Sequence, residues 1–191
     1  MSANLATLID RWHFTVADYH RMGETGILGA GDRVELIEGE IVAMPPIGSP
    51  HGGRVNRLNR LLSAALGDRA VLSPQNPIVL GEHSEPEPDL AVLRPRADFY
   101  TESHPQAADA LLLIEVADSS IAYDLQVKVP LYARHGIPEV WVVDIPDRRV
   151  FRFSRLSREA GRYLDQSTLD LKAATPIPGL SDCSVVLAGL F

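Results

Sequence analysis

The feature that most constrains the fold is a continuous apolar run from Leu111 to Ala117, which carries one carboxylate, Glu115, near its far end. The run lacks the alternation of a half-exposed strand and is shorter than a typical helix, so it predicts a strand buried on both faces. An unpaired carboxylate in such a strand is costly unless it takes up a proton. Glu115 therefore needs a hydrogen-bonding partner, a cation or a chemical task, and it stands where ligands bind in open α/β sheets.

A second carboxylate is predicted beside the first. Pro88-Asp89 precedes another apolar run, Leu90 to Leu93, so we expect Asp89 at the mouth of a neighbouring strand. Two carboxylates about 4 Å apart repel by roughly 4 kcal/mol at an effective dielectric constant near 20, so a divalent cation would stabilise the pair. Oxygen ligands of this kind suit Mg²⁺, Mn²⁺ or Ca²⁺.

Length and composition favour one soluble globular domain over residues 1–191, because 46% of the residues are hydrophobic and 23% are charged. The single cysteine, Cys183, excludes an internal disulfide and suggests a reducing compartment. No span is long enough to cross a membrane, and the N-terminus lacks a basic region followed by an apolar one. We therefore expect a cytoplasmic protein.

The formal net charge of −7 argues against indiscriminate binding of nucleic acids. Local charge can still differ from the sum. Arg54, Arg57 and Arg60 recur at i+3 spacing on a predicted helix, and a C-terminal segment contains Arg148, Arg149, Arg152, Arg155, Arg158 and Arg162. These arginines could bind phosphates, or they could form solvated faces whose apolar stems cover the edge of the core.

The pattern along the chain predicts alternating helices and strands behind an N-terminal arm over 1–13. Helices are expected over 16–22, where Thr15 and Asp18 have the spacing of a capping box, and over 51–66 and 123–135. Strands are expected over 33–37 and 40–44, which would form a hairpin, and over 70–73, 77–80, 90–93, 111–117, 139–144, 150–153 and 161–165.

Three expectations concern how these elements join. The strand-helix-strand unit from Leu111 to Asp144 should be a right-handed parallel crossover. Pro130 should bend the helix within that unit or delay its start, because proline removes a backbone donor. The tail through Leu190 is expected to lie along the surface.

Several of these residues carry a resemblance to a known family. Pro88-Asp89, Ile114-Glu115-Val116 and Lys128 resemble the active-site signature of the PD-(D/E)XK nuclease superfamily. More closely, the chain from about Phe14 to Phe191 is similar to the Uma-two family of restriction-endonuclease-like proteins. The residues that carry this similarity are Glu35-Leu36-Ile37-Glu38-Gly39-Glu40, Glu115-Val116, Asp124, Lys128, Tyr132, Gly136-Ile137-Pro138-Glu139 and Trp141-Val142-Val143-Asp144.

The resemblance implies a mixed α/β (α+β) fold, in which helices flank a central mixed sheet with an N-terminal hairpin and a C-terminal antiparallel extension. It also implies hydrolysis of phosphodiester bonds in duplex DNA. Asp89 and Glu115, with the carbonyl of Val116, would hold Mg²⁺ or Mn²⁺, and Glu35 would be a third carboxylate. The superfamily usually places its lysine where Ala117 stands here, so the resemblance implies that Lys128 on the following helix takes that role.

Each of these residues also has a plainer interpretation. Asp124 and Lys128 could be an ordinary i,i+4 helix pair worth about 0.3 to 0.5 kcal/mol. Glu35 could be exposed on an edge strand. A surface histidine that caps a helix is the favoured interpretation of His51, with contact to a phosphate or to the site as the alternative. Tyr132 and Trp141 are interpreted as core residues.

Three functions remain open from the sequence. The leading one is a metal-dependent DNA endonuclease, which would act most simply as a homodimer because two-fold symmetry supplies one site per DNA strand. The second is a catalytically silent domain with the nuclease fold that binds DNA or a protein partner. The third is a small-molecule hydrolase, for which the sequence has no substrate-specific motif.

Overall fold

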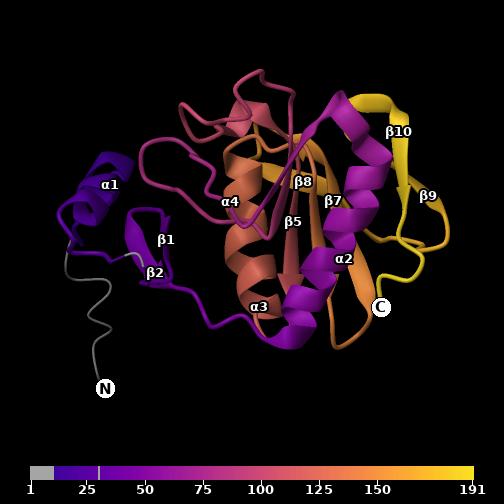
Figure 1. Ribbon diagram of the computed structural model, residues 1–191, viewed down its shortest axis with the longest axis horizontal. Coiled ribbons are helices and arrows are strands. Elements are labelled where there is room, and N and C mark those ends of the chain that lie inside the picture. Colours follow the sequence, from indigo (N-terminus) through magenta and orange to yellow (C-terminus); the bar gives the residue numbers. More distant parts are fainter. Residues whose placement is uncertain (1–10, 30) are drawn as a thin grey trace.

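A six-stranded mixed sheet forms the centre of the protein in the computed structural model, which describes residues 11–29 and 31–191 (Figure 1). Its strands follow the order β3-β4-β5-β6-β7-β8, and β5 and β6 pair in parallel. They are β3 (Val71–Pro74), β4 (Leu90–Leu93), β5 (Ala110–Ala117), β6 (Val140–Asp144), β7 (Arg149–Ser157) and β8 (Arg162–Thr168). The predicted central mixed sheet and its antiparallel extension are thereby confirmed. Residues 1–10 of the predicted arm lie outside the described residues.

Helices and two hairpins complete the architecture. The hairpins are β1 (Val34–Ile37) with β2 (Glu40–Ala43), and β9 (Ala174–Ile177) with β10 (Leu180–Val186). The helical elements are α1 (Val16–Glu24), α2 (Ser49–Leu66), η2 (Gly67–Arg69), η3 (Ala107–Asp109), α3 (Ile121–Tyr123), η4 (Asp124–Lys128) and α4 (Val129–Arg134). Thr15 caps α1 with the predicted capping box. None of these helices is both long and apolar enough to cross a bilayer within the part of the chain that the structure describes.

The sheet has a hydrophobic core on each face. One core joins α2 and β10 to side chains of β5 such as Leu112 and Ile114. The other joins α4 and Ile37 of β1 to Leu113 and Ala117. Because neighbouring residues of a strand point to opposite faces, Glu115 lies on the same face as Leu113 and Ala117, the face that α4 covers. All eight residues of β5 are buried, which confirms the predicted two-sided burial.

The segment around Pro130 differs in detail from the expected helix over 123–135. The chain is already helical at Ile121, and the five residues Asp124–Lys128 form a π-helical turn directly before α4. Pro130 stands in the first turn of α4, directly after the π-helical turn, so its missing N–H falls where the hydrogen-bond pattern changes. The disturbance expected from this proline therefore takes the form of a wider turn, a feature that often accompanies functional sites.

Two expectations for the chain are wrong. Residues 77–80 form no strand and contribute only an isolated bridge from Val79 to Gln106. The tail does not lie along the surface, because it forms the β9–β10 hairpin and buries Cys183, Val185 and Leu187 in the core beside α2. Their spacing of two is the strand signal that identifies this hairpin in the sequence.

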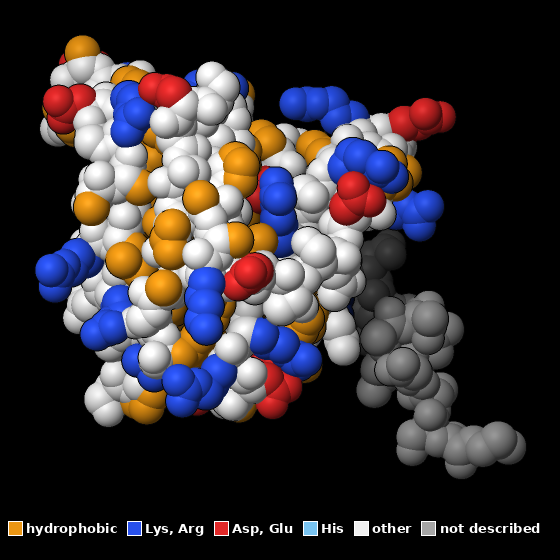
Figure 2. Space-filling view, turned by 90° about the vertical axis from the view of Figure 1, so that its right-hand side faces the viewer, with side chains coloured by type: hydrophobic (Ala, Val, Ile, Leu, Met, Phe, Trp, Pro, Cys, Tyr) orange, Lys and Arg blue, Asp and Glu red, His pale blue; other side chains and the backbone are white. Residues whose placement is uncertain are grey.

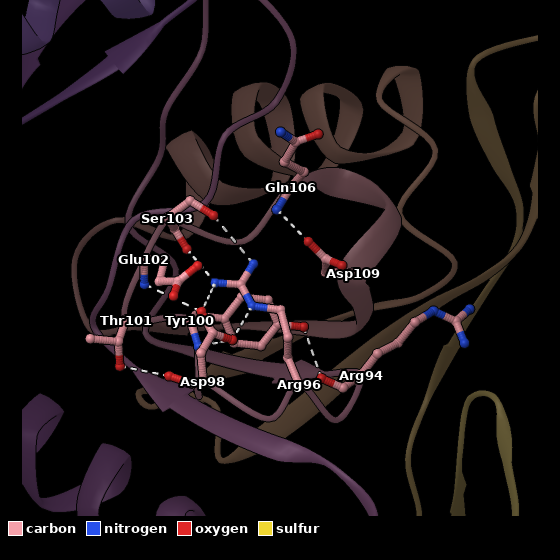
Figure 3. Close-up of polar contacts among 9 residues, drawn as sticks. All are labelled: Arg94, Arg96, Asp98, Tyr100, Thr101, Glu102, Ser103, Gln106 and Asp109. Carbon is pink, nitrogen blue, oxygen red and sulfur yellow. Dashed lines mark hydrogen bonds and ion pairs between the residues drawn. The ribbon is translucent and has the colours of Figure 1, made fainter.

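The excursion between β4 and β5 is held together by its own polar contacts, as Figure 3 shows. Arg96 makes a bidentate ion pair with Asp98, at 2.6 and 3.0 Å, and its guanidinium carbon lies 3.8 Å from the centroid of the Tyr100 ring. Asp98 also accepts the backbone N–H groups of Tyr100 and Glu102. Leu93 pairs with Ala110, so this loop lies at the end of the sheet opposite to Asp89 and Glu115.

Candidate active site

Asp89 and Glu115 are brought together by the register of two neighbouring strands. Leu90 of β4 pairs with Ile114 of β5 in antiparallel fashion, so one step further along each strand Asp89 stands opposite Glu115. Side chains directly opposite each other in such a pair have Cβ atoms about 5 Å apart. The N–H of Val116 donates to Asp89 Oδ2 at 2.8 Å, and both carboxylates line one cavity of about 350 Å³.

Lys128 reaches back from the π-helical turn into this cavity. Its Nζ lies 3.1 Å from Glu35 Oε2 and 3.4 Å from Glu115 Oε1, and its side chain is only 7% exposed. Asp124 instead accepts from the hydroxyl of Ser120 at 2.8 Å, and within residues 11–29 and 31–191 no ion pair joins Asp124 to Lys128. The interpretation of Asp124 and Lys128 as a simple helix pair is therefore wrong.

Glu35 is buried on β1, so its interpretation as an exposed edge residue is also wrong. Its two oxygens are both occupied by protein donors. Oε1 accepts from the Tyr123 hydroxyl at 3.3 Å, while Oε2 accepts from the backbone N–H of Glu87 at 3.2 Å and pairs with Lys128. The β1–β2 hairpin thus contributes an anchor for the lysine of the helix.

Tyr132 has a polar role that the sequence interpretation missed. It is fully buried, as expected of a core residue, but its hydroxyl donates to Glu115 Oε1. Tyr132 follows Lys128 by four residues, which places both side chains on one face of the helical segment. A tyrosine rather than a phenylalanine at a buried position near a lysine is the signal that could have revealed it, because a buried hydroxyl needs a partner.

His51 lies in the site rather than on the surface. Its Nε2 is 3.0 Å from Asp89 Oδ2, and the hydrogen bond with Asp89 raises the pKa of this histidine despite partial burial. His51 stands in the first turn of α2, which Gly48 and Pro50 help to start close to the mouth of the cavity. The favoured interpretation as a surface capping residue is therefore wrong, and the alternative contact with the site is what the structure has.

The hydrogen bonds leave one oxygen on each of two carboxylates for a ligand. Asp89 Oδ2 is held by Val116 and His51, and Glu115 Oε1 is held by Tyr132 and Lys128. Across the described residues, no hydrogen bond is donated to Asp89 Oδ1 or Glu115 Oε2. Glu35 differs, because both its oxygens are engaged.

The site contains more negative than positive charge. Burial raises the pKa of Glu115 well above its ordinary value, and burial raises the pKa of Asp124 to about 6. Burial alone would lower the pKa of Lys128, but the charges of Glu115 and Glu35 outweigh it and raise that pKa. Burial thus raises the pKa of the carboxylates, whereas the surrounding carboxylates raise the pKa of the lysine. The excess is relieved either by a proton on a carboxylate or by a further cation.

The donor set fits a small hard cation that keeps part of its water. No group of three or more His, Cys, Asp or Glu side chains is arranged around a common metal position in the part of the chain that the structure describes. Asp89 and Glu115 offer two oxygens, and the C=O of Val116 points to the same side as its N–H, toward Asp89. Mg²⁺ is typically held by one or two carboxylates together with water and substrate phosphates.

The chain is similar to nuclease-related proteins. The Uma2 family model, whose description reads "Putative restriction endonuclease", matches residues 16–188. A crystal structure from Anabaena variabilis, described as "a putative nuclease belonging to DUF820", has a TM-score of 0.69 at 16% identity and covers 93% of this chain and 97% of that chain. At this identity the likeness concerns the fold. No curated protein matches the chain.

Proposed function

The chain belongs to the Uma2 family of restriction-endonuclease-like proteins, and on that premise we propose that it is a Mg²⁺-dependent endonuclease that hydrolyses phosphodiester bonds of duplex DNA. The observation that carries this proposal is the pair of carboxylates on adjacent strands, Asp89 and Glu115, each with one oxygen that accepts no hydrogen bond from the described residues. Mn²⁺ is expected to substitute for Mg²⁺, because both prefer oxygen ligands.

In this proposal Asp89, Glu115 and the carbonyl of Val116 hold the cation. A bound Mg²⁺ ion supplies a Lewis acid that neutralises charge on the phosphate and acidifies a bound water molecule. The protein's own groups fix the geometry: Val116 and His51 orient Asp89, and Tyr132 orients Glu115. This support restrains both carboxylates, which line the same cavity.

Lys128 serves as a cation in this scheme and not as a base. Its raised pKa, which results from Glu115 and Glu35 outweighing burial, keeps the ammonium group charged at neutral pH. A charged lysine beside the cavity stabilises the negative charge that develops on the phosphate and can orient the attacking water. Glu35 contributes by holding Lys128, since its oxygens are already engaged.

The test is cleavage of supercoiled plasmid by purified protein with Mg²⁺ or Mn²⁺, beside the isosteric variants Asp89→Asn and Glu115→Gln. Asp165→Asn is the matched control, because this carboxylate is half-exposed and pairs with Arg155 on β7. We expect cutting by the wild type and the control only. Cutting that survives both site variants would assign the activity elsewhere, and a wild type that binds DNA without cutting it would favour the catalytically silent domain.

We further propose that two chains act together as a homodimer, since one site of this kind cuts one strand. The expected solution mass at micromolar concentration is twice the 20.9 kDa of the chain. Light scattering coupled to size-exclusion chromatography measures it, and a monomeric mass with double-strand cutting retained would contradict the dimer.

A further inference from the structure

A second group of cations lies at the same end of the sheet as the cavity. Arg54 follows His51 by one helical turn on α2, and Arg148 lies in the turn between β6 and β7. Because β6 runs parallel to β5, this turn is at the end of the sheet where Glu115 stands. In Figure 2, Lys and Arg side chains gather at the lower end of the face drawn, the end at which Figure 1 places the C-terminus and the start of α2.

The ring of Phe191 lies beside both arginines. The guanidinium carbon of Arg54 is 5.6 Å from the centroid of the Phe191 ring, and that of Arg148 is 6.0 Å from it. Phe191 also packs against the core that α2 covers, and this packing fixes the position of its ring. The three residues form one unit, which we call the arginine ledge.

The arginines of the ledge differ from those within β7 in having no acidic partner. Elsewhere on β7 the guanidinium groups are paired: Arg149 with Asp144 and Asp147, Arg152 with Glu139, and Arg155 with Asp165. Within the described residues no carboxylate lies within 4.0 Å of Arg54 or Arg148.

Arg54 is the more informative of the two. It is partly buried, and its Nε is a buried donor without a partner among the described residues. A desolvated cationic donor is costly unless an anion meets it. Arg149 engages both Asp144 and Asp147, so the acids of the adjoining turn do not serve Arg54 or Arg148.

We propose that the arginine ledge binds backbone phosphates of a nucleic acid strand that also enters the cavity at Asp89 and Glu115. This inference rests on the proposed function and extends it. Both guanidinium groups border the same ring, so one strand can contact both of them. Arginine forks match phosphate geometry, and such contacts position a nucleic acid without reading its sequence.

The test is binding of a fluorescein-labelled DNA duplex, measured by anisotropy in EDTA so that cleavage does not interfere. The double variant Arg54→Gln with Arg148→Gln is expected to weaken binding by about 10-fold and to reduce the slope of log K against log salt by about 2. The charge-matched control is Arg155→Gln with Arg162→Gln, at the other end of the β7–β8 pair, and it should bind like the wild type.

Two further variants keep the test decisive. Arg148→Gln alone changes an exposed turn residue and is expected to fold as the wild type and to give about half the change in salt slope. Arg54→Lys with Arg148→Lys should restore most of the affinity, because the contact depends on charge. Equal binding by the wild type and the double glutamine variant would overturn the proposal that the ledge binds DNA. Release of the duplex by inorganic phosphate at a concentration equal to that of the duplex would also overturn it.

The outcomes separate the ledge from the nuclease proposal. If the wild type cuts plasmid but the ledge variants bind DNA normally, the proposed role of the ledge is wrong and the nuclease proposal stands. If the wild type never cuts but its DNA binding depends on Arg54 and Arg148, the ledge stands and the nuclease proposal is wrong. A wild type that binds no DNA overturns both.

Discussion

The two ends of the central sheet hold ion-pair clusters of different kinds. At one end, Arg96 and Asp98 form a matched pair within a surface loop, one cation for one anion. At the other end, Lys128 lies buried among Glu35, Glu115 and Asp124, so the anions outnumber the cation. A matched surface pair ties a loop together, whereas an unmatched buried cluster demands a proton or a ligand. This difference indicates that the Arg96–Asp98 pair is structural and that the buried cluster around Lys128 is the candidate site.

The largest effect should come from removing the buried cation. Lys128→Met leaves Glu35 and Glu115 buried without their partner, and we expect a loss of about 3 to 5 kcal/mol in the free energy of unfolding. Urea denaturation followed by circular dichroism measures it. The double variant Lys128→Met with Glu35→Gln should recover part of the loss, and a loss below about 1 kcal/mol would contradict the buried ion pair.

Glu115→Gln should separate stability from activity. The substitution removes a charge from a cluster with excess negative charge, so the unfolding free energy without divalent ions should stay equal or rise. On the proposed function, cleavage should fall by about 100-fold or more, because an oxygen proposed to bind the metal is lost. Parallel denaturation and plasmid assays test both parts, and a variant that loses stability while it keeps activity would reverse the expectation.

The burial of Asp124 also predicts how stability depends on pH. Asp124 has a pKa of about 6 in the folded chain, raised by burial from an ordinary value of 3.8. Its stabilising proton is therefore fully bound below pH 3.8 and is lost as the pH rises through about 6. We expect the unfolding free energy in EDTA to decrease by roughly 1 to 3 kcal/mol between pH 4.5 and 7.5, since one pKa unit is 1.36 kcal/mol.

The matched control for this pH effect is Asp124→Asn, which should flatten the curve between these two pH values. Mg²⁺ at millimolar concentration should also flatten it, because a cation replaces the proton as the partner of the carboxylates. Stability that rises with pH in EDTA over this interval would contradict the raised pKa of Asp124.

The smallest effect is expected at the opposite end of the sheet. Asp98→Asn weakens the ion pair with Arg96 and the hydrogen bonds from the backbone N–H groups of Tyr100 and Glu102. The loop should become more sensitive to limited proteolysis, while the melting temperature and plasmid cleavage change little. A loss of cleavage comparable to that of Glu115→Gln would mean that the two ends of the sheet are coupled.

Local patterns predicted much of the fold. The capping box at Thr15, the hairpin turn at Glu38-Gly39 and the apolar face of α2 are each determined by residues a few positions apart. The β9–β10 hairpin was missed because its apolar alternation is short and begins only at Cys183, three residues after Leu180. Its burial depends on packing against α2, which is far away in the sequence.

The sequence by itself determined that Glu115 is buried at the end of a strand, because the apolar run around it leaves no exposed face. It also determined that Asp89 begins a neighbouring strand. Only the tertiary structure decided which donors meet each carboxylate oxygen: Lys128 from the π-helical turn, Tyr132 from α4 and His51 from α2. The physical reason is that hydrogen bonds act over about 3 Å, and such contacts between distant segments are fixed by packing and not by local spacing.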